Sequence, residues 1–115
     1  MEHFMPQISY SVTATLPDRH AADRYLRWLT EGHVQEVLKG GAHDARVVEL
    51  ESDHAVQVET TYLFPDRSTY ETYVREHAPR LRADGLRRFG DLPGVSFTRR
   101  QGSVIFQHQA GVRPS

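Results

Sequence analysis

The same three-residue motif, PDR, occurs twice in this chain after an apolar residue, each time where a segment of alternating apolar and polar residues meets an amphipathic helical pattern. "LPDR" spans residues 16–19 and "FPDR" spans residues 64–67. Apolar and polar residues alternate before each motif, which is typical of a half-buried strand, and a helical pattern follows it. Asp18 and Asp66 are placed to accept hydrogen bonds from the free amides of a helix start. The chain is therefore predicted to contain two similar β-α-β halves.

Four strands are expected in these two halves. They are predicted at residues 7–16, 43–50, 55–64 and 95–107. A bulge or break is expected at Gly102, because glycine inside a strand often marks one.

Two helical regions are expected between the strands. The first is predicted to run as one helix from Ala21 to the Gly40–Gly41 pair, with an apolar stripe that ends at Leu38. The second begins after Asp66, and Pro79 is expected to open a further helical turn, since proline suits a first-turn position.

The order strand, helix, strand, strand, helix, strand predicts an α+β, ferredoxin-like βαββαβ fold. Right-handed crossovers place both helices on one face of a four-stranded antiparallel sheet. The 115 residues suit a single domain over 1–115, with an ordered core at 7–109 and a frayed tail at 110–115.

The other sheet face is expected to be polar but poor in charge. Freely solvated faces usually carry more charge, so this face is predicted to pack on the same face of a second copy. The resulting assembly would be a homodimer with a closed, two-sheet barrel. The alternative is a monomer in which one sheet face is exposed to solvent. The face consists of Ser9, Ser11, Thr13, Thr15, Gln57, Glu59, Thr61 and Leu63.

Charge and composition exclude several classes of function. The chain has 14 basic and 15 acidic residues and a net charge of -1, so neither a nucleic-acid surface nor a membrane surface is expected. It contains no cysteine, which rules out disulfides and thiolate sites and fits the cytoplasm. Residues 1–7 lack the apolar run of a signal peptide, and no segment is long enough to span a bilayer.

Two longer stretches carry a family resemblance, "WLTEGHVQEVLKGGAHDARV" (28–47) and "YETYVREHAPRLRADGLRRFGD" (70–91). With the first strand, they resemble a small bacterial family of unknown function in the dimeric α+β barrel superfamily. That superfamily includes antibiotic-biosynthesis monooxygenases, haem-degrading monooxygenases, and small isomerases and cyclases. The resemblance implies a dimer and a pocket between helices and sheet, and it carries no catalytic assignment.

His33 and His77 are the candidate catalytic residues, because both lie on apolar helical stripes at equivalent positions of the two halves. One interpretation is a packed imidazole paired with a backbone carbonyl or with a carboxylate such as Glu36 or Glu59. The other is a ligand pocket in which histidine acts as a base, a donor or a ligand. No metal site is predicted, since no close spacing of two histidines and an acid occurs.

Haem is a second possibility that the resemblance implies, because haem-binding members of the superfamily hold it through a histidine on the second helix, where His77 lies. Tyr70 and Tyr73 enter the same layer and would compete with a large haem cleft.

Five further residues are candidate ligand-binding residues. The single tryptophan could form a pocket wall and donate its indole N–H, and a buried tyrosine hydroxyl needs a partner. An arginine on the second strand could hold an anionic group, although an edge salt bridge is the simpler interpretation. These candidates are Trp28, Tyr62, Tyr70, Tyr73 and Arg46.

The sequence therefore predicts a small-molecule-binding protein. If it is an enzyme, the expected chemistry is acid–base catalysis without a cofactor, of isomerase, cyclase or monooxygenase type. A haem protein and a non-catalytic ligand-binding or interaction module remain the alternatives.

Overall fold

The strands form one antiparallel sheet in the order β2-β3-β1-β4, in a computed structural model that describes residues 5–111. This order, with β1 and β3 as the two central strands, confirms the ferredoxin-like prediction. The register pairs Tyr10 with Tyr62 and, on the other side, with Gln101. The strands are β1 (Ile8–Leu16), β2 (Asp44–Leu50), β3 (Val56–Phe64) and β4 (Ser96–Ser103).

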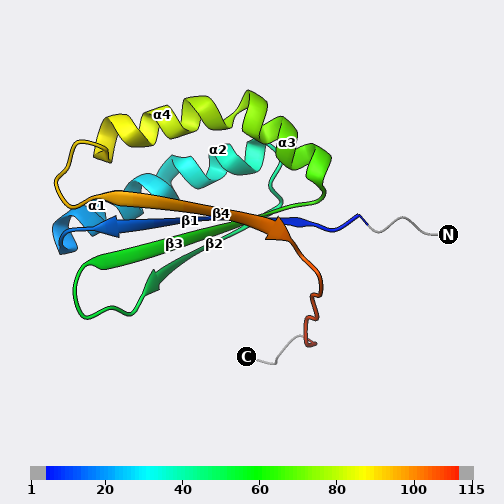
Figure 1. The fold of residues 1–115 in the computed structure, drawn as a ribbon, viewed down its shortest axis with the longest axis horizontal. Coiled ribbons are helices and arrows are strands. Elements are labelled where there is room, and N and C mark those ends of the chain that lie inside the picture. Colours follow the sequence, from blue (N-terminus) through cyan, green and yellow to red (C-terminus); the bar gives the residue numbers. More distant parts are fainter. Residues whose placement is uncertain (1–4, 112–115) are drawn as a thin grey trace.

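All helices cover one face of this sheet, and the opposite face is left open (Figure 1). Two helical regions lie side by side above the strands, one from each half of the chain. The elements are α1 (Arg19–Trp28), η1 (Leu29–His33), α2 (Val34–Lys39), α3 (Arg67–Glu76) and α4 (Ala78–Phe89).

Both predicted helix caps are present. Asp18 Oδ1 accepts from the amide of Ala21 at 2.9 Å, and Asp66 Oδ1 accepts from the amide of Thr69 at 2.8 Å. The bond from Thr69 also lowers the pKa of the Asp66 carboxyl. The two halves therefore begin their helices in the same way.

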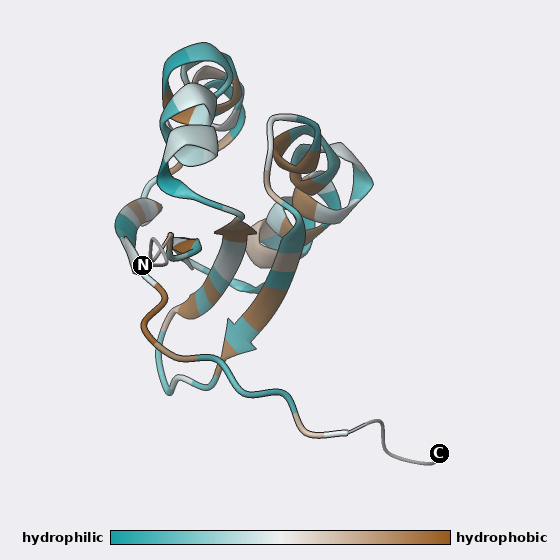
Figure 2. Ribbon diagram, turned by 90° about the vertical axis from the view of Figure 1, so that its right-hand side faces the viewer, coloured by the Kyte–Doolittle hydropathy of each residue, from teal (hydrophilic) through white to brown (hydrophobic). Residues whose placement is uncertain are grey.

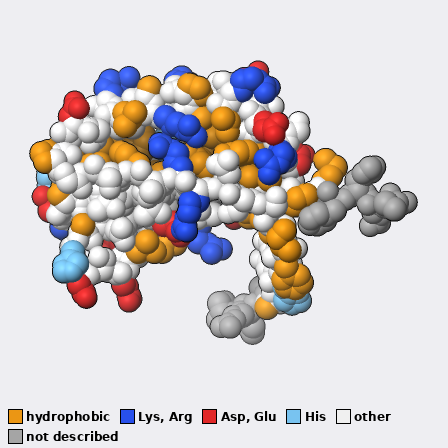
Figure 3. Space-filling view, in the orientation of Figure 1, with side chains coloured by type: hydrophobic (Ala, Val, Ile, Leu, Met, Phe, Trp, Pro, Cys, Tyr) orange, Lys and Arg blue, Asp and Glu red, His pale blue; other side chains and the backbone are white. Residues whose placement is uncertain are grey.

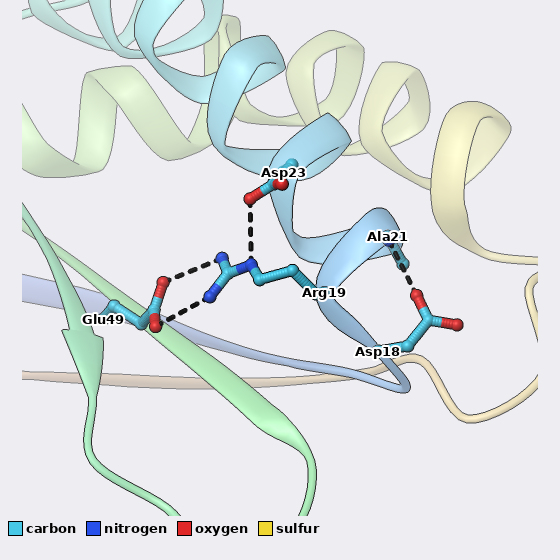
Figure 4. Close-up of polar contacts among 5 residues, drawn as sticks. All are labelled: Asp18, Arg19, Ala21, Asp23 and Glu49. Atoms are coloured by element: carbon cyan, nitrogen blue, oxygen red, sulfur yellow. Dashed lines mark hydrogen bonds and ion pairs between the residues drawn. The ribbon is translucent and has the colours of Figure 1, made fainter.

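The first cap is followed by an ion-pair network that ties α1 to the edge strand β2 (Figure 4). Arg19 reaches both carboxylate oxygens of Glu49, at 3.0 and 2.9 Å, and also Asp23 at 3.0 Å. Hydrogen bonding from Arg19 lowers the pKa of Glu49. All three side chains are about half exposed, so the network orients the helix more than it stabilises the fold.

The first helical region is broken, which the prediction of one continuous helix missed. Glu31 and Gly32 leave helical geometry, and the amide of Val34 bonds to the carbonyl of Leu29 five residues back. Thr30 donates its hydroxyl to the carbonyl of Leu26 at 2.8 Å, a side-chain contact that competes with the helical ladder. Beyond the break, Leu38 is 36% exposed and does not continue the apolar stripe.

The last strand is shorter and more regular than expected. It ends at Ser103, where the prediction continued to residue 107, and Gly102 pairs directly with Ser9 without a bulge. At the other predicted boundary, Pro79 does lie in the first turn of α4. The expected tail at 110–115 is described only as far as Gly111, and residues 112–115 lie outside the described part.

The core lies between the sheet and the helices. Strand residues alternate between apolar and polar, as Figure 2 shows along the visible strands, and the apolar set faces the helices. Val58, Tyr62 and Phe64 on β3 are at most 1% exposed. On the open face, Ser11 and Thr61 share a hydrogen bond of 3.3 Å. Within residues 5–111, no helix combines the length and apolarity needed to cross a bilayer.

Candidate functional site

A small cavity lies between the sheet and the helical layer, and its walls are largely aromatic. Its volume is about 40 Å³, which is room for a water molecule and far below the roughly 300–1,000 Å³ of drug-sized ligand sites. Figure 3 shows apolar side chains in a hollow between helices and sheet, with basic side chains beside it. The aromatic lining consists of Tyr10, Tyr25, Trp28, Tyr62, Tyr73 and Phe97.

One wall of the cavity is a stacked pair, Trp28 and His33. Their ring centroids lie 4.1 Å apart with an interplanar angle of 24°. The break in the first helical region makes this contact possible, because it re-aims His33 after Trp28 has ended α1. The stacking is therefore a local contact between two residues that are five positions apart in the chain.

The stack is held against α4 by two features of that helix. Trp28 Nε1 donates to Asp84 Oδ2 at 3.0 Å, and this bond is the leading cause of the lowered pKa of Asp84. Gly85 leaves room for the indole, since a Cβ at that position would lie 3.2 Å from Trp28 Cη2. The indole N–H is thus used within the protein and is not free for a ligand.

His33 is a neutral imidazole at physiological pH. Burial lowers its pKa to about 4; nearby Asp84 opposes this shift and Arg99 adds to it. A neutral ring retains one nitrogen able to accept a proton. The site therefore presents a proton acceptor beside an aromatic wall.

The polar part of the lining contains two buried atoms that lack partners. Among the described residues, Thr60 Oγ1 and Arg82 Nε are buried and make no hydrogen bond, and both residues line the cavity. Thr60 is fully buried in the central part of β3. Buried polar groups are normally paired, so these two atoms can form hydrogen bonds to a polar group that enters the cavity.

Two tyrosines of the cavity are held in their protonated form. Burial raises the pKa of Tyr62 and of Tyr73 well above the ordinary value. At neutral pH the hydroxyls of Tyr62 and Tyr73 can donate hydrogen bonds but cannot act as bases. A third tyrosine, Tyr10, accepts a hydrogen bond of 3.4 Å from Arg82.

A second, larger hollow lies on the outer side of the helices, between α1–α2 and α4. It is a groove of about 980 Å³, open to solvent. Trp28, His33 and Leu81 line both this groove and the inner cavity. The stacked pair therefore separates the two spaces.

Of the two candidate histidines, His33 lines the inner cavity and His77 does not, which departs from the interpretation in which both line one pocket. It occupies the junction of α3 and α4, the position that matches His33 at the start of α2. Its ring packs against Gly40 and lies 6.3 Å from the ring of Tyr73. The repeat predicted equivalent chain positions, but the two rings face different surroundings.

Tyr70 and Arg46 also lie away from the cavity. Tyr70 belongs to the apolar core and donates to Gln101 at 3.1 Å. Arg46 pairs with Thr61 in the register of β2 and β3, which puts it on the open face, exposed to solvent. Neither residue lines the inner cavity, which departs from their prediction as ligand-binding residues.

The haem interpretation does not fit these residues. His77 packs against Gly40 and lines neither the inner cavity nor the outer groove, and the volume of the inner cavity is about 40 Å³. In residues 5–111, no group of three or more His, Cys, Asp or Glu side chains is arranged to hold a metal ion.

Several residues that line the cavity were not predicted from the sequence, among them Tyr10, Thr60, Arg82 and Arg99. Tyr10 and Thr60 looked like ordinary members of apolar strand faces. Arg82 lies in a basic run that resembles a solvated helix face. The only available signal was a polar threonine within the apolar face of β3.

The sheet, the helices on one face and the cavity between them define a ferredoxin-like α+β protein. The chain belongs to the family described as a domain of unknown function, DUF4286, whose model matches residues 7–100. No similar sequence was found among curated proteins.

Several solved structures share the fold. A dimeric ferredoxin-like protein from an uncultured marine organism is 17% identical, with a TM-score of 0.65 over 90% of this chain and 99% of that one. SnoaB, a cofactor-independent oxygenase from Streptomyces nogalater, is 10% identical, with a TM-score of 0.63 over 89% and 96%. A monooxygenase from Streptomyces coelicolor in complex with the ligand Nanaomycin D is 15% identical, with a TM-score of 0.62 over 96% and 94%.

Proposed function

We propose that this protein binds a small cyclic organic compound with a carbonyl or phenolic oxygen in the inner cavity, and that His33 removes a proton from it. The observation that carries this proposal is the pair of unpartnered polar atoms, Thr60 Oγ1 and Arg82 Nε, in a cavity walled by aromatic rings. Aromatic walls bury a flat ring, and the two polar atoms supply hydrogen bonds to its oxygen.

The chemical step is the ionisation of a carbon acid. The C–H bond next to a carbonyl breaks, its electron pair forms an enolate, and the proton passes to the neutral ring of His33. Arg82 and Thr60 donate hydrogen bonds to the enolate oxygen and stabilise its charge. The negative charge formed nearby also favours the protonated imidazole, which offsets the low pKa that burial imposes.

The cavity must expand to hold a ring. The exposed groups at its edge are on α4 and β4, where Leu86 is 55% exposed and Arg99 is exposed as well. Removal of a proton is a step that isomerases, cyclases and cofactor-independent oxygenases can share. The similarity in fold to SnoaB supports this class of chemistry by analogy.

We also infer that two copies associate through their open sheet faces. The face is polar but holds no lysine, and several of its side chains are half-buried even in a single chain. The similar marine protein is described as dimeric. The absence of cysteine supports placement in the cytoplasm, where thiols stay reduced.

Hydrogen–deuterium exchange of 2-tetralone, an enolisable ketone, tests the acid–base step. The wild-type protein in D2O should accelerate exchange at the α-carbon, followed by NMR, by about 10²–10⁴-fold over buffer. His33→Gln should abolish the acceleration, whereas His20→Gln, at an exposed histidine of α1, should retain it. Saturable quenching of the single tryptophan without exchange would indicate a binding module and contradict the enzymatic proposal.

Thr60→Val separates function from stability at the same site. Removal of a buried, unpaired hydroxyl should raise the free energy of unfolding by about 1–3 kcal/mol, while tetralone exchange slows. Chemical denaturation and the NMR assay measure the two effects. A variant that exchanges as fast as the wild type would contradict the assigned role of Thr60.

A further inference from the structure

The C-terminal arm, residues 104–111, is the least expected part of the molecule. It leaves the end of β4 on the side of the sheet that the helices do not cover (Figure 1). Ile105 is 77% exposed and Phe106 is 82% exposed, adjacent in sequence. Figure 3 shows apolar side chains along this arm, away from the body of the protein.

Hydrogen bonds to Gln7 hold the base of the arm in place and so orient it. The amide of Val104 donates to the carbonyl of Gln7 at 2.8 Å. The side chain of Gln7 donates to Gln107 at 3.0 Å and contacts His43 Nε2 at 2.7 Å. Further out, the rings of Phe106 and His108 lie nearly parallel, 6.4 Å apart. An arm held this way loses less conformational entropy when it meets a partner.

The uncharged arm suits the apolar part of the open sheet face. Residues 104–111 contain no Asp, Glu, Lys or Arg. The open face carries apolar side chains on β2 and β3, because Val48 and Leu50 share the face of Glu59 and Gln57, and Leu63 lies there too. Val48 is 36% exposed, so an apolar side chain could cover it.

We propose that the arm of each copy packs against the sheet of a second copy of this chain, with Ile105 and Phe106 as the contacting side chains. This inference rests on the proposed association of two copies through their open faces. It adds that the C-terminal arm of each copy contacts the other copy. A twofold axis makes the contact reciprocal, so each copy gives one arm and receives one. Burial of two large apolar side chains then favours the dimer.

Cross-linking from the arm provides a direct test, because the chain has no cysteine. Phe106→Cys supplies a unique thiol for a benzophenone maleimide, and the labelled protein is mixed with ¹⁵N-labelled unmodified protein. Irradiation should join the arm to peptides of β2 or β3 from the ¹⁵N chain. Leu86→Cys, an exposed apolar position on α4, should give no such product. Cross-links confined to one chain would overturn the proposal.

Sedimentation equilibrium supplies the energetic measurement. The double variant Ile105→Ser with Phe106→Ser should raise the dimer dissociation constant at least tenfold, and Leu86→Ser should leave it unchanged. Circular dichroism controls for folding, since the arm lies outside the packed core. If the wild-type protein is a monomer, both the proposed dimer and the proposed contact of the arm are contradicted. A dimer that the double variant does not weaken would overturn the arm proposal only.

Discussion

At the scale of single residues, the Trp28–His33 stack is the feature around which the candidate site is arranged. Trp28 is hydrogen-bonded to Asp84 and stacks on His33, and the partial burial of His33 lowers its pKa so that the histidine stays neutral. The sequence identified both residues as candidates, but it paired His33 with His77. The true neighbour is five residues away, because the helix breaks between them.

The pH dependence of stability should report on His33. Its folded pKa of about 4 lies below the ordinary value of 6.5, so between these pH values the unfolded chain binds a proton that the folded chain does not. The free energy of unfolding should therefore fall as the pH drops from about 6.5 to about 4.

His33→Phe keeps an aromatic ring against Trp28 and removes the titration. Compared with the wild type, the variant should lose less stability over this acidic window. Urea denaturation at several pH values, followed by circular dichroism, measures the difference. Because other acidic and histidine groups titrate in both proteins, the difference between the two profiles isolates His33. Parallel profiles would rule out the assigned burial.

At the scale of elements, the ends and breaks of the helices decide where side chains meet. The Gly40–Gly41 pair ends α2 as predicted, and Gly41 adopts a φ of 127°, which favours glycine. This turn also lies against α3, because a Cβ on Gly41 would be 2.6 Å from Thr69 Cγ2. The turn therefore joins the two halves of the protein.

Gly41→Ala should destabilise the fold by about 1–3 kcal/mol, from strained backbone and contact with Thr69. Gly102→Ala is the matched control, because a Cβ there has no heavy atom within 4 Å. Thermal unfolding by calorimetry compares the two variants. An equal melting temperature for both would mean that the turn tolerates a side chain.

At the scale of the whole molecule, helices cover one face of the sheet and leave the other face open. The polar open face contacts either water or a second copy of the chain. A charged side chain introduced at the centre of this face would be tolerated in water but would disrupt a dimer interface. Thr61 is suitable, since it lies in the middle of β3 and contacts Ser11 across the sheet.

Thr61→Lys should convert a dimer into a monomer, because two like charges meet across a twofold interface and repel each other. Ser68→Lys, at an exposed position of α3, adds the same charge and should leave the dimer intact. Light scattering measures the mass of both variants and of the wild type. If the Thr61→Lys variant has the same dimeric mass as the Ser68→Lys variant, the open face is not the dimer interface.

Local signals made most of the fold predictable. Alternation located β1 and β3 to within a residue at each end, and the two PDR motifs located both helix caps. The break at Glu31–Gly32 was missed, although a glycine inside a helical pattern, close to Thr30, is the kind of signal that should lower confidence in a continuous helix.

The sequence by itself determined the order of elements, the two-half repeat and the face that each strand buries, because these follow from periodicity and capping along the chain. Only the tertiary structure decided which side chains share a cavity. Thr60, Arg82 and His33 come from three different elements, and their meeting depends on the crossover, on a helix break and on room left by Gly85. His77, an equal candidate in the sequence, packs elsewhere because its neighbours across the fold differ.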